Sequence, residues 1–288
     1  MTGTSVSSSP ALIAVRAFLE ERIEHGKLEL PMLSEVAMET LKLCESDTAD
    51  AAQLSAIVHR DQSLASHLLR IANSPLYASA TPIVSLQQAI GRMGLRMLSE
   101  IVVAIATGAR VFRVPEFEPM MKILWKHSIV SGAFAKEIAR ARRRNVEGAF
   151  LCGLLHDVGK PVLLQAIADW QKAQNQQVHP IDLAIVLDEF HMKVGSELAK
   201  RWKLPEQVIV AIAYHHDYAA VQAHAEAAML SSLADALSYH TVGGPEALDV
   251  AGIRALPVLE DLNLYPDDVE ALLGKKDLVL SLAEAFCS

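Results

Sequence analysis

The chain has few cysteines, few aromatic residues and no long apolar run, and these shortages exclude several kinds of protein. Three cysteines in 288 residues, Cys44, Cys152 and Cys287, are too few and too scattered for a disulfide framework or a cysteine-based zinc site. The longest apolar runs, such as 101–109, fall far short of the roughly 18 residues of a membrane span. The first ten residues contain neither a basic nor an apolar stretch typical of signal peptides. We therefore expect a cytoplasmic protein with no membrane partner.

An excess of basic residues is also missing. The formal net charge of -8 argues against nucleic acid as a partner, because a generic nucleic-acid binder needs a basic face. One basic run, 140–144, stands out against this balance. It has two interpretations: a solvated helix end, where cations favour the carboxyl-terminal dipole, or a rim that gathers phosphates or nucleotides.

The composition favours helices. Only 5% of the residues are aromatic, whereas 51% are hydrophobic, which is enough for one large core or two modest ones. No stretch alternates between apolar and polar residues for more than a few positions, so we predict an all-α fold. Turn residues bound helical segments expected over 11–25, 32–45, 51–58, 62–73, 84–92, 94–110 and 120–143.

The turn residues between these segments also divide the chain into four predicted parts. Residues 1–10 are rich in serine and are expected to form a disordered tail. An amino-terminal helical lobe should occupy 11–115, and a second lobe should occupy 116–242. The rest, 243–288, predicts an extension of two or three helices, to which the sequence assigns no role.

Seven potential metal ligands lie in apolar helical sequence in the second half of the chain. They are His127, His156, Asp157, His191, His215, His216 and Asp235. Buried polar groups are costly unless they form hydrogen bonds or bind a metal, and imidazole with carboxylate suits Zn, Fe, Mn or Ni. On its own, His127 would more often be a structural histidine, and the His156–Asp157 pair would be evenly balanced between the two interpretations.

The adjacent histidines give a hint about the number of metals. Pro205 suits the first turn of a helix that runs to His215 and His216. Neighbouring positions on a helix diverge by about 100°, so the two side chains can serve two metals, or one metal and a substrate. This geometry favours a dinuclear site.

The sequence around His156–Asp157 resembles the HD superfamily of metal-dependent phosphohydrolases. His127 upstream, the doublet, and Asp235 downstream follow that superfamily's four-ligand pattern in its usual order. Further matches, to the two-metal HD-GYP phosphodiesterases, are His191, His215, His216 and Lys160. Independent core histidines have no reason to repeat a family's ligand order, so the seven together predict a metal site.

A second resemblance covers more of the chain, from about residue 28 to about residue 240. Four motifs carry it: Leu30-Pro31-Met32-Leu33, His59-Arg60-Asp61-Gln62-Ser63-Leu64, Ala72-Asn73-Ser74-Pro75-Leu76-Tyr77 and Ala89-Ile90-Gly91-Arg92-Met93-Gly94. They resemble the amino-terminal half of the HDOD domain, the HD-related output domain of bacterial signalling proteins. This resemblance implies an amino-terminal helical lobe packed on an HD-type helical lobe.

The two resemblances differ in what they imply for the site. HDOD domains often have an eroded ligand set and are regarded as output modules without proven catalysis, whereas this chain keeps the ligands. It departs from HD-GYP proteins in two places. The Gly-Tyr-Pro loop after Asp217 is missing, and Ile123 stands where a glutamate precedes His127 by four residues.

By resemblance, Asp157 would bridge two metal ions. His127, His156 and Asp235 would complete one site, and His191, His215 and His216 the other. Fe or Mn is favoured for such a pair, with Zn or Ni as alternatives. The catalytic candidates are Asp157 and Lys160, which would neutralise a phosphate oxygen; the alternative for Lys160 is a helix-capping lysine.

Two functions follow as expectations. The first is a signalling module that binds a partner protein, and also a nucleotide or phosphate ligand, with little or no turnover. The second is a metal-dependent phosphohydrolase that acts on a nucleotide or a cyclic dinucleotide. The missing Gly-Tyr-Pro loop argues against cyclic-di-GMP as the substrate.

Overall fold

The computed structural model describes residues 9–44, 50–77, 81–143, 148–244 and 246–287, and these form helices and connecting segments without a strand. The all-α prediction is confirmed. The helices of the first half are α1 (Pro10–Glu24), α2 (Glu35–Cys44), α3 (Ala51–Val58), α4 (Gln62–Ala72), α5 (Leu86–Met93) and α6 (Leu95–Arg110). The 3-10 turn η1 (Pro115–Phe117) follows.

The second half continues with longer helices. They are α7 (Glu118–Ala141), α8 (Ala149–Leu155), α9 (Gly159–Gln174), α10 (Pro180–Arg201), α11 (Glu206–Tyr214), the 3-10 turn η2 (Tyr218–Ala220) and α12 (Ala225–Val242). Four helices complete the chain: α13 (Val250–Arg254), α14 (Val258–Asp261), α15 (Pro266–Leu273) and α16 (Lys276–Cys287). Within its described residues, the extension therefore contains one helix more than the upper expectation of three.

Side-chain caps explain several helix starts. Asp50 and Gln53 form a capping box at α3, and the Asp61 side chain accepts the Leu64 N–H at the start of α4. Ser85 caps α5 in the same way. These caps lie at the starts of the segments predicted over 51–58, 62–73 and 84–92.

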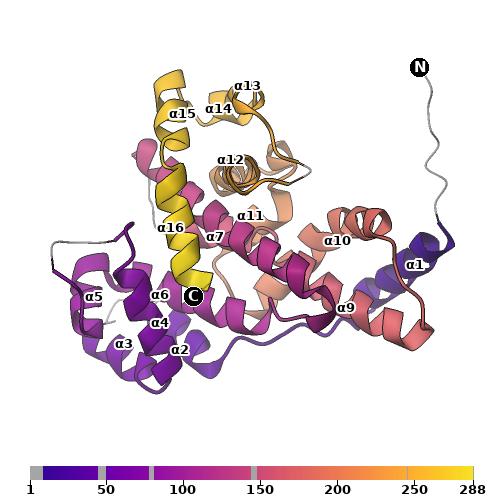
Figure 1. Ribbon diagram of the computed structural model, residues 1–288, viewed down its shortest axis with the longest axis horizontal. Coiled ribbons are helices and arrows are strands. Elements are labelled where there is room, and N and C mark those ends of the chain that lie inside the picture. Colours follow the sequence, from indigo (N-terminus) through magenta and orange to yellow (C-terminus); the bar gives the residue numbers. More distant parts are fainter. Residues whose placement is uncertain (1–8, 45–49, 78–80, 144–147, 245, 288) are drawn as a thin grey trace.

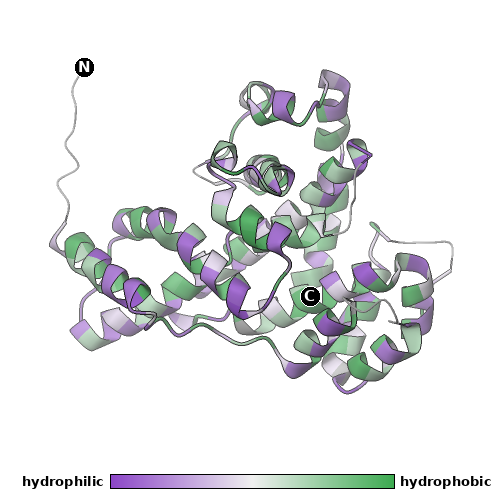
Figure 2. Ribbon diagram, turned by 180° about the vertical axis from the view of Figure 1, so that it is seen from behind, coloured by the Kyte–Doolittle hydropathy of each residue, from purple (hydrophilic) through white to green (hydrophobic). Residues whose placement is uncertain are grey.

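A first lobe consists of α2 to α6. These helices pack on one another around α6, whose residues 101–104 are fully buried. Their ribbons carry hydrophobic and hydrophilic residues side by side (Figure 2), which fits helices that are buried on one face only.

The first helix does not belong to that lobe. Figure 1 shows α1 beside α9 and α10, away from α2–α6, and its contacts are with these two helices. The Arg16 guanidinium pairs with Glu189 at 2.8 Å, and the Ser9 hydroxyl donates to Asp182 at 2.5 Å. The predicted lobe of 11–115 therefore begins too early, because α1 is amphipathic but its apolar face packs against the second lobe.

The predicted amino-terminal tail also needs a correction at its end. Ser9 caps α1 through its side chain, and Pro10 is the first residue of the helix. The rest of that prediction, 1–8, lies outside the described residues.

The second lobe contains α7 to α12, and α7 is its central helix. It packs on α8, α12 and α16. The stretch Ala149–Gln174, through α8 and α9, is long and apolar enough to cross a membrane, yet 89% of its most apolar window is buried in the fold. It is the kind of segment found in the core of a soluble protein.

The last helix joins the two lobes. Contacts of α16 reach α7 in the second lobe and α4 in the first. Phe286 lies 6.3 Å from the ring centroids of Trp125 and Phe150, and 6.2 Å from that of His67. Residues 276–287, to which the sequence assigns no role, therefore pack across the boundary between the lobes.

Candidate metal centre

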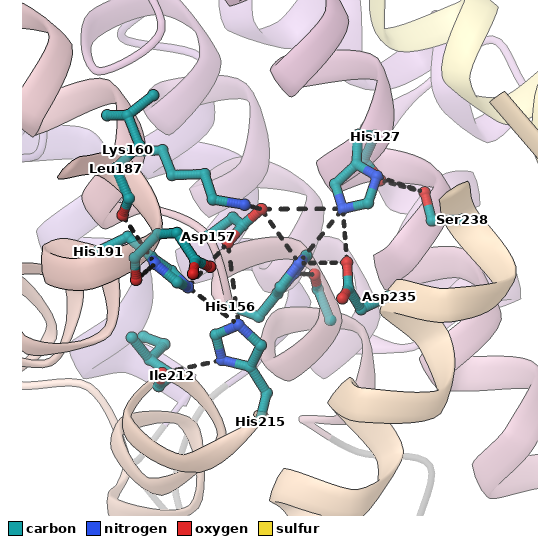
Figure 3. Close-up of polar contacts among 12 residues, drawn as sticks. His127, His156, Asp157, Lys160, Leu187, His191, Ile212, His215, Asp235 and Ser238 are labelled. Carbon is teal, nitrogen blue, oxygen red and sulfur yellow. Dashed lines mark hydrogen bonds and ion pairs between the residues drawn. The ribbon is translucent and has the colours of Figure 1, made fainter. Parts of the chain in front are cut away.

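Five segments bring the seven predicted ligands to one place in the second lobe. His127 lies on α7, His191 on α10 and Asp235 on α12. The others follow helix ends: His156 and Asp157 come directly after α8, and His215 and His216 come directly after α11. Figure 3 shows Asp157 between His191 and His215 on one side and His127 and Asp235 on the other.

Two glycines allow the helices to approach closely enough for this convergence. A Cβ on Gly153 would lie 2.5 Å from the Ser131 carbonyl oxygen, so α8 could not pack this closely on α7 with any larger residue. A Cβ on Gly159 would lie 2.0 Å from the carbonyl oxygen of His191 itself. The first contact sets α8 against the helix of His127, and the second sets α9 against the helix of His191.

The first group of ligands is His127, His156, Asp157 and Asp235, and all four are buried. The Nε2 atoms of His127 and His156 are 3.3 Å apart. Asp235 Oδ1 lies 2.9 Å from the first of these nitrogens and 3.2 Å from the second. Asp157 Oδ2 faces the same two nitrogens at 3.9 and 3.5 Å.

The second group consists of three histidines. The Nε2 atoms of His191 and His215 are 3.3 Å apart, and the rings of His215 and His216 have centroids 4.2 Å apart. Asp157 Oδ1 lies 3.5 Å from His191 Nε2 and has no hydrogen-bond partner, although it is buried. Asp157 thus presents one carboxylate oxygen to each group. His216 is exposed, so the second group is open to solvent.

The helical geometry expected for the adjacent histidines is wrong. The helix ends at Tyr214, His215 is its C-cap, and His216 lies beyond it. Both side chains consequently join the same group instead of diverging toward two different ones. The divergence of about 100° holds only inside a helix.

Hydrogen bonds at Nδ1 fix the orientation of three of the rings. The partners are carbonyl oxygens: Gly153 for His156 at 2.7 Å, Leu187 for His191 at 2.9 Å and Ile212 for His215 at 3.0 Å. A carbonyl oxygen only accepts, so Nδ1 carries a proton in all three rings, and Nε2 of a neutral ring presents a lone pair to the centre.

These lone pairs explain why the donor set fits metal ions. His191 and His215 direct two lone pairs at each other across 3.3 Å, close to an orphaned carboxylate oxygen. Such a cluster is stabilised by a cation at its centre, and nitrogen with oxygen donors is the set that divalent transition metals prefer.

The electrostatics of the first group point the same way. Burial alone would lower the pKa of His156, but Asp157 and Asp235 outweigh it and raise that pKa to about 10. Burial alone would raise the pKa of Asp235, but its contacts with His127 and His156 hold that pKa far below its usual range. The two carboxylates therefore stay ionised and attract positive charge.

Lys160 supplies one such charge. Its Nζ lies 2.6 Å from Asp157 Oδ2, and both side chains are buried. Burial opposes the ammonium form, yet Asp157 raises the pKa of Lys160 above its ordinary value. The lysine lies in the first turn of α9 and pairs with Asp157, so it does not cap a helix end.

Two residues next to the site were missed by the sequence reasoning. The Ser238 hydroxyl lies 3.1 Å from His127 Nδ1, and the Tyr239 ring has its centroid 4.3 Å from that of His127. They follow Asp235 by three and four positions on α12, which places them on the same helix face. That spacing was the available signal.

Other residues singled out in the sequence have structural contacts. Arg60, in the turn between α3 and α4, pairs with Glu39 of α2 at 2.5 Å. In the basic run, Arg140 pairs with Glu137, and Arg142 pairs with Glu226 and donates to the Leu262 carbonyl. Arg144 lies outside the described residues. These ion pairs favour the structural interpretation of the run over a phosphate-gathering rim.

The six remaining histidines are not among the candidate ligands in the described part of the chain. They are His25, His59, His67, His179, His224 and His240.

Comparisons with known proteins agree with this architecture. The family model for the HDOD domain matches residues 30–218. An uncharacterized protein of Treponema pallidum (strain Nichols) is 29% identical over 210 residues, which are 70% of this chain and 39% of that protein. This chain therefore spans well under half the length of that curated relative.

Two solved structures share the fold. One, from Shewanella amazonensis SB2B, is named a "Putative metal-dependent phosphohydrolase"; it has a TM-score of 0.77 and 19% identity, covering 96% of this chain and 100% of that one. The other, from Marinobacter aquaeolei VT8, is named a "Putative signal transduction protein"; it has a TM-score of 0.70 and 25% identity, covering 99% of this chain and 68% of that one.

Proposed function

The chain belongs to the HDOD family, and we propose that it is a signalling module that has kept an HD-type dinuclear metal site and acts by binding a ligand or a partner. One observation carries this proposal: seven side chains from five segments converge so that imidazole nitrogens and carboxylate oxygens meet in a largely buried cluster. A purely structural core would pair such groups with donors.

Each group of ligands would hold one ion. His127, His156 and Asp235 would bind the first, and His191, His215 and His216 the second, with Asp157 between them. The mixture of nitrogen and oxygen donors favours Fe or Mn, with Zn or Ni as alternatives. Two such ions would lower the pKa of a bound water and hold phosphoryl oxygens.

The contacts between the lobes suggest how metal or ligand binding at the site could be transmitted to a partner protein. Glu100, on α6 of the first lobe, accepts the backbone N–H of Gly148 at 2.7 Å, directly before α8. Lys136, on α7, lies 3.3 Å from the Tyr77 hydroxyl of the first lobe. The first lobe thus touches the two helices that position His127 and His156. A ligand shifts such a contact only if its affinity differs between two arrangements.

The proposed partners are a signalling protein and a nucleotide or phosphate ligand. Because His216 is exposed, the second group of ligands is accessible to solvent, whereas the first group is buried. An incoming phosphate would meet the open group first and would find the Lys160 ammonium beside Asp157.

Accessibility also favours one alternative function, a metal-dependent phosphohydrolase. Catalytic metal sites keep a position open for water or substrate, whereas structural sites are closed. The exposed His216 leaves the second group open and meets that requirement.

Two measurements separate these functions. Elemental analysis after anaerobic purification should give about two transition-metal ions per chain, and less than about half an ion would contradict the metal site. Hydrolysis of bis-p-nitrophenyl phosphate and cyclic-di-GMP should be absent or slow in the loaded protein, while phosphate or nucleotide binding should be lost in His156→Ala and kept in the control His59→Ala. Turnover on the order of 1 per second that is lost in Asp157→Ala would establish the phosphohydrolase instead.

A further inference from the structure

One ligand differs from its neighbours in the group that faces its Nδ1 atom. His156, His191 and His215 each have a backbone carbonyl oxygen there. His127 has the Ser238 hydroxyl instead, at 3.1 Å. The same hydroxyl lies 2.9 Å from the backbone carbonyl oxygen of His127.

A hydroxyl can do what a carbonyl cannot, because it donates one hydrogen and also accepts. If the Ser238 hydroxyl donates to the His127 carbonyl, its oxygen can accept a proton carried by Nδ1. If it donates to Nδ1, that nitrogen must be the unprotonated one, and the proton of the neutral ring lies on Nε2. Both tautomers of His127 therefore have a partner at the Nδ1 side.

The opposite edge of the ring needs both tautomers at different times. Asp235 Oδ1 lies 2.9 Å from His127 Nε2, a distance at which an Nε2–H donates to the carboxylate. A metal ion at that position requires the Nε2 lone pair, with the proton on Nδ1.

We propose that Ser238 is a positioning residue that lets His127 exchange tautomers when the first group takes up a metal ion. Without metal, Nε2–H donates to Asp235 and the Ser238 hydroxyl donates to Nδ1. With metal, Nδ1–H donates to the Ser238 oxygen, and the hydroxyl turns to the His127 carbonyl. The inference rests on the metal binding proposed above.

The exchange balances protons and needs no movement of the ring. The Nε2 proton is released to solvent when a metal ion takes that position, and Nδ1 takes up one proton from solvent, so the ring carries one proton before and after the exchange. The Tyr239 ring, 4.3 Å away between centroids, packs against His127 and keeps its plane in place. His127 and Ser238 are both buried, so water does not replace the hydroxyl as the partner of Nδ1.

The test uses Zn²⁺, a diamagnetic probe, on the full chain labelled with ¹⁵N-histidine. Long-range ¹H–¹⁵N spectra at pH 8 report which ring nitrogen carries the proton, and the His127 signals are assigned by their loss in His127→Gln. We expect an Nε2–H ring in the chelator-treated wild type and an Nδ1–H ring with Nε2 bound after Zn²⁺ is added.

The affinity for Zn²⁺ gives a second readout. Ser238→Ala should weaken the first bound Zn²⁺ at least about tenfold, the usual loss when a partner of a ligand is removed. Ser238→Thr keeps the hydroxyl and should restore the affinity. Ser231→Ala is the matched control, because Ser231 is equally buried on α12 but its hydroxyl has no hydrogen-bond partner.

The outcomes are distinguishable. An Nδ1–H ring, or a ring protonated on both nitrogens, in the metal-free wild type would overturn the exchange while leaving the metal site intact. An affinity of Ser238→Ala for Zn²⁺ equal to that of the wild type would also overturn the exchange and leave the metal site intact. A wild type that binds no Zn²⁺ would overturn both the exchange and the proposed function.

Discussion

The ion pair between Asp157 and Lys160 allows a quantitative test of the electrostatics of the candidate site. Its atoms are 2.6 Å apart, and the two side chains are 2% and 10% exposed. Breaking a buried pair by removing one partner costs about 3–5 kcal/mol, because the other charge is left without compensation. Replacing both partners with neutral residues of similar size removes that charge as well, and it is often nearly neutral.

We therefore expect a large coupling energy in a double-mutant cycle on the metal-free protein. Asp157→Asn and Lys160→Met should each lower the free energy of unfolding by about 3 kcal/mol. The double variant should lose much less than the sum, which gives a coupling of about 3 kcal/mol between the two positions.

The chain offers a matched control on α10. Glu197 and Lys200 have the same three-residue spacing and a similar distance, 2.7 Å, but their side chains are 57% and 55% exposed. Solvent screens such a pair, so its coupling should stay under about 1 kcal/mol. The two cycles differ mainly in burial.

Urea unfolding in the presence of EDTA measures both cycles. Circular dichroism follows all helices, and tryptophan fluorescence follows the second lobe, where Trp125, Trp170 and Trp202 lie. Coincident transitions by the two probes are required for the free energies to be compared. Equal coupling energies for the buried and the exposed pair would refute the claim that Asp157 is held ionised by Lys160 inside the site.

Two further predictions concern the helices that position the site. Burial raises the pKa of Glu100 to about 7 from an ordinary value of 4.5, against the opposing effect of the Gly148 N–H. Between these two pKa values the folded state holds a proton that the unfolded state has lost. The free energy of unfolding should therefore fall by on the order of 3 kcal/mol between pH 4.5 and 7. Urea unfolding at a series of pH values measures this, and a Glu100→Gln variant whose free energy of unfolding falls as steeply with pH as that of the wild type would contradict it. Gly159→Ala should lower the free energy of unfolding by about 1–3 kcal/mol, because its Cβ would overlap the His191 carbonyl. The control Gly91→Ala, with nothing within 4 Å, should raise it by up to about 1 kcal/mol, and equal effects at the two glycines would exclude the close helix crossing.

The helices were predictable from the sequence wherever a local signal marks their ends. The segment expected over 51–58 matches α3 residue for residue, because Asp50 caps it and its apolar positions are periodic. The short helices α13 and α14 have five and four residues, too few for a period to show. This explains why the extension was expected to contain fewer helices.

Placement in space was harder to predict than helix formation. The apolar face of α1 is visible in the sequence, but a hydrophobic face does not say which surface will cover it. Its partners include Glu189 and Asp182, about 170 positions away. The extended segment 27–34 carries the chain from α1 to α2, and Trp202 holds it by donating to the Pro31 carbonyl at 2.8 Å.

The convergence of the seven side chains could be expected for a different reason: their residue types follow one another along the chain in the order of a known superfamily's ligand pattern. The positions of the protons on the histidine rings depend on three-dimensional contacts, which the order of residues along the chain does not reveal. Three rings are fixed by carbonyls of residues three or four positions earlier, Gly153, Leu187 and Ile212, which lie in the same helix as the ring or in the helix that it follows. The fourth ring, His127, depends on Ser238, which is 111 positions away on another helix. A serine three residues after a candidate ligand on a helix is therefore worth testing as the partner of a second ligand, since a shared helix face directs both side chains to one site.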